Sequence, residues 1–306
     1  METSEIKKEL EKFDVGEIVL ISKFSLGVIN DNFLVQTDER KYVLRIYNFK
    51  KTKHEVVPEL ETLSWLQEAN FPSPKIVTNH NNERVIFINN KPGVLFNYIK
   101  GRHLFSNDVD SEIILQVGSH LGRFHRILKD KQLSVKKPGW GVDSLTDLFN
   151  THEKRIRQST IKDADLFMDL ISNELRTLKQ DSNLTQGIIH PDIKPENVLF
   201  ERKLLTGILD FDDITESALI DNIAITIIWW CFNNGKLQKD LYETMLYGYQ
   251  SEFSLSGEEL ALIPKHMKSV ALKGILSWCY KVLHRPDNAY TGAKEFYDIY
   301  QTLKKT

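Results

Sequence analysis

Cysteine is scarce in this chain, and long apolar runs are missing. The two cysteines are Cys231 and Cys279, and neither belongs to a CxxC pair or to a Cys/His cluster. This pattern predicts neither a disulfide scaffold nor a zinc site, and it is typical of buried thiols in a reducing compartment. The most apolar run, residues 223–232, is far shorter than the roughly 20 residues that a membrane-spanning helix needs.

An excess of charge of one sign is also lacking. The formal net charge is -2 over 306 residues, of which 27% are charged. Such a balance gives no general attraction to nucleic acid or to an anionic membrane. The charged start, METSEIKKEL, lacks the apolar core of a secretory signal. We therefore expect a cytoplasmic protein that binds neither nucleic acid nor membranes, and the sequence leaves open whether it is a monomer or a homodimer.

Strand-like and helix-like patterns divide the chain into two parts. β-branched and aromatic residues alternate partly in the first third, whereas apolar residues recur at helical spacing further on. We expect a strand-rich lobe over residues 1–97 and a mostly helical lobe over residues 98–306, joined by a link near residues 97–102. The expected strands are 17–24, 28–37, 42–47, 85–88 and 93–99, and the expected helices include 55–70, 110–128 and 163–179.

A polar loop between two apolar runs is the strongest chemical signal. The segment GIIHPDIKPENVLF, residues 187–200, contains four polar residues of chemical interest, His190, Asp192, Lys194 and Asn197. Strand ends that are joined by short polar loops hold side chains rigidly at one place. Phosphoryl transfer depends mainly on such positioning and on charge stabilisation.

A second acidic signal follows closely. In GILDFDDI, residues 207–214, an apolar run ends in three carboxylates, Asp210, Asp212 and Asp213. A single acidic turn after a strand is most often a solvated turn or a helix cap. Two polar loops in this order and at this spacing are much less expected by chance, and their carboxylate and amide oxygens suit a hard cation such as Mg²⁺.

The spacing HxDxxxxN followed by DFD is similar to the catalytic loop and metal-binding motif of the protein-kinase-like fold. The resemblance implies a bilobal α+β fold, with an antiparallel sheet and one main helix in the N-terminal lobe. It implies ATP and Mg²⁺ as cofactors, with Asn197 and Asp210 as the metal ligands. Asp192 would accept the proton of the attacking hydroxyl. His190 would brace the loop, and Lys194 would place positive charge near the transferred phosphoryl group.

The N-terminal lobe would bind the nucleotide. KFSLGVINDNFLV resembles the hairpin that covers the phosphates in this fold, although Gly27 is its single glycine. The next strand carries Arg45 where protein kinases have a phosphate-binding lysine, and an arginine keeps its charge and can bond phosphate in a fork. The partner of Arg45 on the following helix is expected to be Glu59, with Glu61 as the alternative.

The segment VLFNYIKG falls where the two lobes join. The resemblance implies that Asn97, Tyr98 and Ile99 line the adenine site there with backbone donors and acceptors. For any single side chain of this segment, a plain edge strand is the alternative.

No long activation segment follows Asp213, since ITESALIDN leads directly into IAITIIWWCF. A peptide substrate would lack its docking platform, which makes a protein kinase the less expected reading. The layout resembles the aminoglycoside phosphotransferase and choline kinase superfamily, and within it the homoserine kinase-like group. Motifs that carry the resemblance over about residues 20–235 include INDNFLV, YVLRIY, LGRFH and HPDIKPENVLF. It implies an ATP- and Mg-dependent phosphotransferase that acts on a hydroxyl of a small molecule, best matched by an amino alcohol such as homoserine.

The acceptor contacts are predicted from charge and aromatic character. Asp212 and Asp213, with Glu216 as a further candidate, would attract an ammonium group. Trp230, with Trp229 and Trp278 as alternatives, would pack on a cation or a sugar face, although a helical tryptophan is more often part of the core. Asp221 is expected to brace the backbone of the catalytic loop. An aminoglycoside kinase and a catalytically dead nucleotide-binding pseudokinase are the alternatives, and the presence of all the catalytic-motif residues favours an active enzyme.

Overall fold

The computed structural model describes residues 3–24, 30–48, 51–104, 108–284 and 289–305. The chain forms two compact units, and each is described by itself. Unit 1 comprises Met1–Arg102, Leu133–Val135 and Val198–Asp212, and unit 2 comprises His103–Gln132, Lys136–Asn197 and Asp213–Thr306. Unit 1 includes the segment 198–212, so the two units do not contain the same residues as the two lobes expected from the sequence. The expected lobe boundary between residues 97 and 98 stays a prediction.

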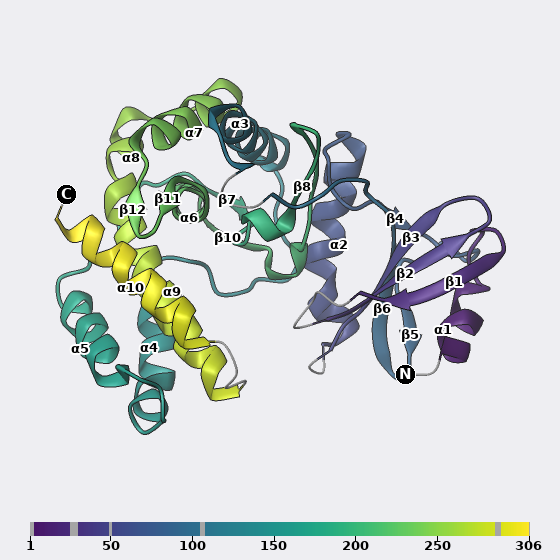
Figure 1. Ribbon diagram of the computed structural model, residues 1–306, viewed down its shortest axis with the longest axis horizontal. Helices are drawn as coiled ribbons and strands as arrows, with labels where there is room; N and C mark the ends of the chain where they lie inside the picture. The colour runs from purple at the N-terminus through teal and green to yellow at the C-terminus, as the bar shows by residue number, and fades with distance from the viewer. Residues whose placement is uncertain (1–2, 25–29, 49–50, 105–107, 285–288, 306) are drawn as a thin grey trace. The chain divides into compact units, whose positions relative to one another are not determined.

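An antiparallel sheet is the main feature of unit 1 (Figure 1). Its strand order is β1-β2-β3-β6-β4, and β5 also pairs with β6. The strands are β1 (Ile18–Lys23), β2 (Asp31–Thr37), β3 (Lys41–Ile46), β4 (Ile76–Val77), β5 (Ile86–Ile88) and β6 (Lys91–Asn97).

One face of this sheet is buried because apolar residues alternate along its strands. Val35 of β2 and both Leu44 and Ile46 of β3 are fully buried, together with Leu10 of α1 (Thr3–Leu10). Residues between them in the sequence therefore point to the opposite face. That alternation is what frees a charged residue in the middle of β3 for the chemistry described below.

Helix α2 (Lys53–Glu68) begins with a capping box. The Thr52 hydroxyl accepts a hydrogen bond from the Glu55 N–H, and the Glu55 carboxylate accepts one from the Thr52 N–H. This reciprocal pair satisfies two N–H groups that the start of a helix leaves unbonded. The helix that follows carries a buried acid, Glu59, which is 2% exposed.

A hairpin and a linking segment complete unit 1. The hairpin consists of β8 (Val198–Glu201) and β9 (Leu204–Ile208), with Val198 opposite Ile208. Arg102 and Phe200 exchange two backbone hydrogen bonds, of 2.8 and 2.9 Å. The chain that leaves β6 is thereby fastened along the hairpin.

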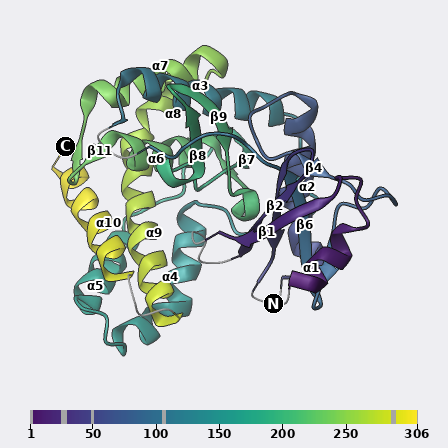
Figure 2. The ribbon, with the colours of Figure 1, turned by 45° about the vertical axis from the view of Figure 1, so that its right-hand side comes forward.

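Helices build most of unit 2 (Figure 1). Helix α6 is its centre, because each of its residues except Trp229 is buried. Helix α9 packs against α4, α6 and α10, and α9 and α10 lie side by side in both views (Figure 1 and Figure 2). The helices are α3 (Ser111–Leu128), α4 (Val142–Arg157), α5 (Ala164–Leu175), α6 (Leu219–Cys231), α7 (Lys239–Glu252), α8 (Gly257–Ala261), α9 (Ile263–His284) and α10 (Ala289–Lys304).

Helices α3 and α7 approach each other closely at small residues. A Cβ atom on Gly118 of α3 would lie 2.3 Å from the carbonyl oxygen of Met245 on α7. A larger residue would force the two helices apart, so the pair depends on glycine at this position. The described helices include none with both the length and the apolar character that crossing a bilayer requires.

The polar loop of unit 2 follows a short two-stranded ladder. Strand β7 (Gln186–Ile189) pairs with β10 (Thr215–Ala218), with Ile189 opposite Thr215. Two further short strands, β11 (Phe232–Asn233) and β12 (Lys236–Leu237), follow α6. The separation of a strand-rich region from a helix-rich one confirms the expected α+β class.

Candidate active site

The predicted catalytic loop begins at His190, which is 1% exposed at the end of β7. The Asn222 side chain of α6 holds both backbone groups of this residue. Its oxygen accepts a hydrogen bond from the His190 N–H at 2.9 Å, and its Nδ2 donates to the His190 carbonyl at 2.7 Å. The start of the loop is therefore fixed to the central helix through a buried pair of hydrogen bonds.

A buried histidine completes this attachment. His125 Nε2 lies 3.1 Å from Asn222 Oδ1, and its Nδ1 lies 2.9 Å from the Tyr249 hydroxyl. Since Asn222 Oδ1 is an acceptor, Nε2 carries the hydrogen and Nδ1 accepts from Tyr249. Burial lowers the pKa of His125 to about 4, although the hydrogen bond to Asn222 opposes that effect. The imidazole is thus neutral and structural.

Asn222, and not the predicted Asp221, braces the backbone of the catalytic loop. Asp221 accepts hydrogen bonds from the Ser217 hydroxyl at 2.7 Å and pairs with His266 Nδ1 at 2.7 Å. It does not reach the loop backbone, which Asn222 holds instead. An asparagine serves that position because it offers a donor and an acceptor together, whereas an ionised aspartate offers acceptors alone.

The loop orients Asp192 through two neighbours. Asp192 Oδ2 accepts hydrogen bonds from Lys194 Nζ and from Asn197 Nδ2, each at 2.8 Å. Asn197 Nδ2 also donates to the Asp192 carbonyl at 2.9 Å. The Asp192 side chain is 26% exposed and that of Lys194 is 27% exposed. The carboxylate is therefore both oriented and accessible, as a general base must be.

The two adjacent tryptophans of α6 have different partners. Trp230 is 3% exposed, and its Nε1 donates to the Ile193 carbonyl at 2.9 Å. This bond fixes Trp230 to the loop backbone, and its predicted contact with the acceptor stays a prediction. Lys194 Nζ lies 5.7 Å from the centroid of the Trp229 ring. Trp229 is therefore the tryptophan whose ring faces a side chain of the loop.

In unit 1, Arg45 joins three polar groups. Its Nη1 lies 3.2 Å from Glu59 Oε1 and 3.2 Å from Asp210 Oδ1, and its Nε donates to Asn32 Oδ1 at 3.2 Å. Burial opposes the charge of Arg45, but the carboxylates of Glu59 and Asp210 outweigh it and raise the pKa of Arg45. The guanidinium therefore keeps its charge.

Glu59 is the carboxylate that Arg45 contacts on α2. The Tyr47 hydroxyl donates to its second oxygen at 2.8 Å. Burial raises the pKa of Glu59 to about 7, an effect that the charge of Arg45 opposes. The alternative partner, Glu61, instead accepts a hydrogen bond from the Ser134 N–H at 3.1 Å.

The acidic turn after β9 separates into three different environments. Asp210 adopts a left-handed backbone with φ 68°, and its side chain is 39% exposed. Asp212 is buried and accepts from Asn30 Nδ2 at 2.8 Å and from Lys51 Nζ at 2.9 Å. Burial alone would raise the pKa of Asp212, but Lys51 and other nearby charges lower it. Asp213 is exposed and begins the next part of unit 2.

The predicted adenine segment follows β6 directly. The Asn97 N–H is donated to the Lys75 carbonyl at 3.0 Å, and the Tyr98 N–H to the Lys41 carbonyl at 3.2 Å. Among the hydrogen bonds of the described residues, none uses the Ile99 N–H. Ile99 thus retains a free backbone donor. Gly27, predicted to lie over the phosphates, falls outside the described residues.

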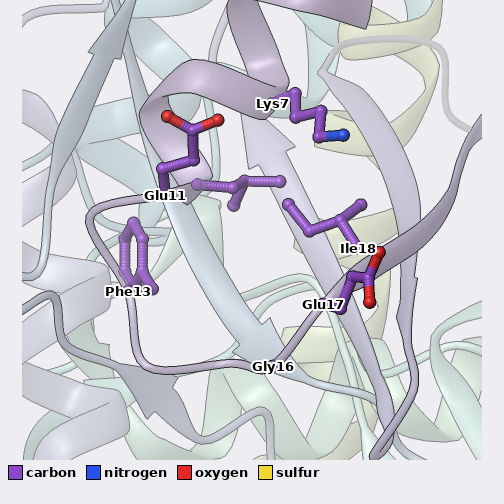
Figure 3. Close-up of a pocket in the computed structure, with 7 residues that line it drawn as sticks. Lys7, Glu11, Phe13, Gly16, Glu17 and Ile18 are labelled. Carbon is purple, nitrogen blue, oxygen red and sulfur yellow. The ribbon is translucent and has the colours of Figure 1, made fainter.

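A hollow of about 300 Å³ lies on unit 1, away from these groups (Figure 3). Residues of α1, of the segment between α1 and β1, and of the start of β1 line it, and none of the described residues predicted for the site is among them. The lining residues are Lys7, Leu10, Glu11, Phe13, Gly16, Glu17 and Ile18.

A comparison with family models decides the family. Residues 21–252 match the model described as the phosphotransferase enzyme family. This chain belongs to that family. The phosphotransferase is 27% identical to a homoserine kinase from Zymomonas mobilis, an alignment that covers 95% of this chain and 90% of the relative. It is 25% identical to a homoserine kinase from a Bradyrhizobium species, over 98% and 91% of the two chains.

Solved structures share the fold of this phosphotransferase. The amicoumacin kinase hAmiN, in complex with AMP-PNP, Ca²⁺ and Ami, matches with a TM-score of 0.74 and 16% identity, over 100% of this chain and 94% of that one. The choline kinase LicA from Streptococcus pneumoniae matches with a TM-score of 0.65 and 16% identity, over 99% of each chain. These matches confirm the predicted protein-kinase-like α+β fold. The family match and the homoserine kinase relatives, and not the solved structures, indicate a small-molecule kinase with a hydroxyl acceptor.

Proposed function

We propose that this phosphotransferase transfers the γ-phosphoryl group of ATP to the hydroxyl of a small amino alcohol, of which homoserine is the best candidate. The arrangement of Asp192 carries the proposal. Its carboxylate is accessible, and it is aligned by two donors on a loop that is fastened to α6. The homoserine kinase relatives align with nearly the whole chain, which supports the acceptor.

Asp192 acts on the acceptor in the proposed reaction. As the hydroxyl oxygen forms its bond to the γ-phosphorus, the bond from that phosphorus to the bridging oxygen of ADP breaks. The hydroxyl proton passes to Asp192, and ADP leaves with the electron pair of the broken bond. A general base of this kind contributes about 10² to 10⁴ in rate. Lys194, bonded to Asp192, would place positive charge near the transferred phosphoryl group.

The oxygen donors of the chain fit a magnesium ion. Asn197 uses Nδ2 for both of its bonds to Asp192, which leaves the amide oxygen as its remaining ligand atom. Asp210 engages Arg45 through Oδ1 and is partly exposed. Within the described part of the chain, no three His, Cys, Asp or Glu side chains are grouped to hold a metal. We propose Asn197 and Asp210 as ligands of Mg²⁺, which when bound with ATP neutralises phosphate charge.

The proposed nucleotide contacts involve Arg45 and Ile99. Arg45 would bond the α- and β-phosphates through the guanidinium N–H groups that Glu59, Asp210 and Asn32 leave free. The Ile99 N–H would donate to the adenine ring. Gly27 stays a prediction for the hairpin over the phosphates.

An acceptor screen tests this function. The purified chain is given ATP and Mg²⁺ with homoserine, 3-aminopropan-1-ol, choline or an aminoglycoside, and ADP formation is measured. We expect turnover of an amino alcohol, a loss of about 10² to 10⁴ in kcat for Asp192→Asn, and no change for the exposed control Glu243→Gln. Turnover of the aminoglycoside alone would replace the proposed acceptor, and Mg-dependent ATP binding without any turnover would indicate the pseudokinase.

A further inference from the structure

Lys273 is a buried cation that the proposed reaction does not use. It lies on α9, is 8% exposed, and donates from Nζ to the Gly139 carbonyl at 2.7 Å and to the Ser144 hydroxyl at 2.8 Å. Both acceptors are neutral. Among the described residues, no carboxylate lies within ion-pair distance of Nζ, and the third ammonium N–H has no acceptor. Buried charges are normally paired, so this ammonium lacks the partner that its environment calls for.

The positive end of α4 lies at the same ammonium. Ser144, which Lys273 contacts, is in the first turn of this 16-residue helix, and its N-cap, Gly141, supplies no side-chain cap. No bond is described for the N–H groups of Asp143 and Ser144. A helix N-terminus carries a partial positive charge and free N–H donors. Gln180 Oε1 accepts a hydrogen bond from the Val142 N–H at 3.1 Å, and the exposed Asp143 places an acidic side chain in the same turn. The feature without a counter-charge is therefore the buried ammonium of Lys273, which favours an anion as the missing component.

An aromatic ring also lies next to the Lys273 ammonium. Lys273 Nζ lies 4.5 Å from the centroid of the Trp140 ring. Burial lowers the pKa of Lys273 to about 8, against the opposing effect of Asp221. An anionic group at Nζ would offset that cost by favouring the charged form.

The loop before α4 connects Lys273 with the catalytic loop inside unit 2. The Trp140 N–H donates to the Ser217 hydroxyl at 2.9 Å, and the Thr215 hydroxyl donates to the Lys137 carbonyl at 3.0 Å. A Cβ on Gly139 would lie 2.9 Å from the Glu216 carbonyl oxygen, so the loop runs directly against β10. Strand β10 pairs with β7, and β7 leads into the catalytic loop.

We propose that Lys273, together with Ser144, binds a carboxylate carried by the hydroxyl acceptor. This inference rests on the proposed function and narrows it. The acceptor class becomes hydroxy acids and hydroxy amino acids, such as homoserine. Amino alcohols without a carboxylate and the polycationic aminoglycosides would leave Lys273 without its anion.

Two acceptors that differ in one carboxylate test the inference. Homoserine carries the group, and 3-aminopropan-1-ol is the same amino alcohol without it. We expect the wild-type protein to prefer homoserine by about tenfold or more in kcat/KM, since a charge-assisted hydrogen bond has that effect on affinity. Equal turnover of the two acceptors, or a preference for 3-aminopropan-1-ol, would overturn the inference while the proposed phosphotransfer stands.

Variants of α9 sharpen the test. Lys273→Met should raise the KM for homoserine by about 10- to 100-fold with little change in kcat, and should leave 3-aminopropan-1-ol unaffected. Lys273→Arg keeps the charge and should restore much of the affinity. Lys268→Met removes a half-buried lysine of the same helix and should leave both acceptors unchanged. An equal loss for both acceptors in K273M would show a merely structural lysine and contradict the inference.

A binding measurement separates this inference from the proposed reaction. 2-Aminobutyrate has the amino acid group of homoserine but no hydroxyl, so its affinity, measured by calorimetry, reports the carboxylate contact alone. Binding that K273M weakens and K268M preserves would support the subsite even if no acceptor were turned over, an outcome that would defeat the phosphotransfer proposal instead. If homoserine is turned over but K273M leaves its KM and the affinity for 2-aminobutyrate unchanged, the subsite is excluded.

Discussion

Asn222 holds the backbone of His190 at both of its polar groups, through hydrogen bonds of 2.9 and 2.7 Å. Both residues are buried, so water cannot replace these bonds. The same carboxamide oxygen lies 3.1 Å from His125. One side chain of α6, three residues after the first residue of the helix, therefore sets the start of the catalytic loop.

Replacing Asn222 tests this attachment. Asn222→Leu keeps the branching at Cγ but is larger, and it leaves the His190 N–H and carbonyl without partners in an apolar environment, which should cost roughly 3 kcal/mol of unfolding free energy. The kcat should fall as well, because Asp192 lies two residues after His190. Denaturant unfolding and steady-state kinetics measure the two effects. The matched control is Thr226→Val on the same helix, whose hydroxyl bonds within the helix and whose replacement should cost about 1 kcal/mol or less, with kcat unchanged.

His125 should make stability depend on pH. Its pKa in the folded protein is about 4, against an ordinary value of 6.5, because burial disfavours the charged form. A depressed pKa gives a contribution that is present above pH 6.5 and is lost as the pH falls toward 4, and it amounts to about 3 kcal/mol. In His125→Gln, which keeps a donor and an acceptor, the free energy of unfolding should fall less between pH 7 and pH 4. Parallel curves for the two proteins would contradict this assignment.

The sequence identified the polar loops but not the surroundings that orient them. The spacing of Asp192, Asn197 and Asp210 is a local property, and so is the apolar alternation that predicts the strands around Arg45. Asn222 lies 32 residues from His190 in the chain, and only the packing of α6 brings them together. Its signal was a polar pair, Asp221 and Asn222, near the start of an otherwise mostly apolar helix, and the sequence offered Asp221 as an equally good candidate.

Helix α4 shows a second limit of the sequence. Its buried residues, Leu145, Phe149 and Ile156, are separated by charged residues, and the helix was not predicted. The acidic residues of the second motif show a third, because their character alone suggested an acceptor contact for Asp212. The structure pairs Asp212 with Lys51, a residue 161 positions away, and chemical type gives no indication of such a distant partner.

Arg45 should not be replaceable by lysine without loss. A guanidinium reaches Glu59, Asp210 and Asn32 at once, whereas an ammonium presents a point charge that cannot span the three. Arg45→Lys should raise the KM for ATP by about tenfold, and Arg45→Met should raise it further and leave Glu59 as an unpaired buried acid. Steady-state kinetics at varied ATP concentration measure whether the KM for ATP rises from wild type to R45K to R45M. The exposed control Arg40→Met should behave as the wild type. An equal KM in R45K and wild type would remove Arg45 from the nucleotide site.

The adjacent tryptophans of α6 should respond differently to the same substitution. Trp230→Phe removes the hydrogen bond to the Ile193 carbonyl and should cost about 1 kcal/mol of stability. Trp229 Nε1 is buried and has no hydrogen-bond partner among the described residues, so Trp229→Phe should be neutral or slightly stabilising. Trp229→Leu also removes the ring that Lys194 faces at 5.7 Å, and kcat should then fall a few-fold as the partner of Asp192 is released. Thermal unfolding and kcat of the three variants, measured side by side, test these predictions. A loss of stability in W229F equal to that in W230F would show that the indole N–H of Trp229 is hydrogen-bonded.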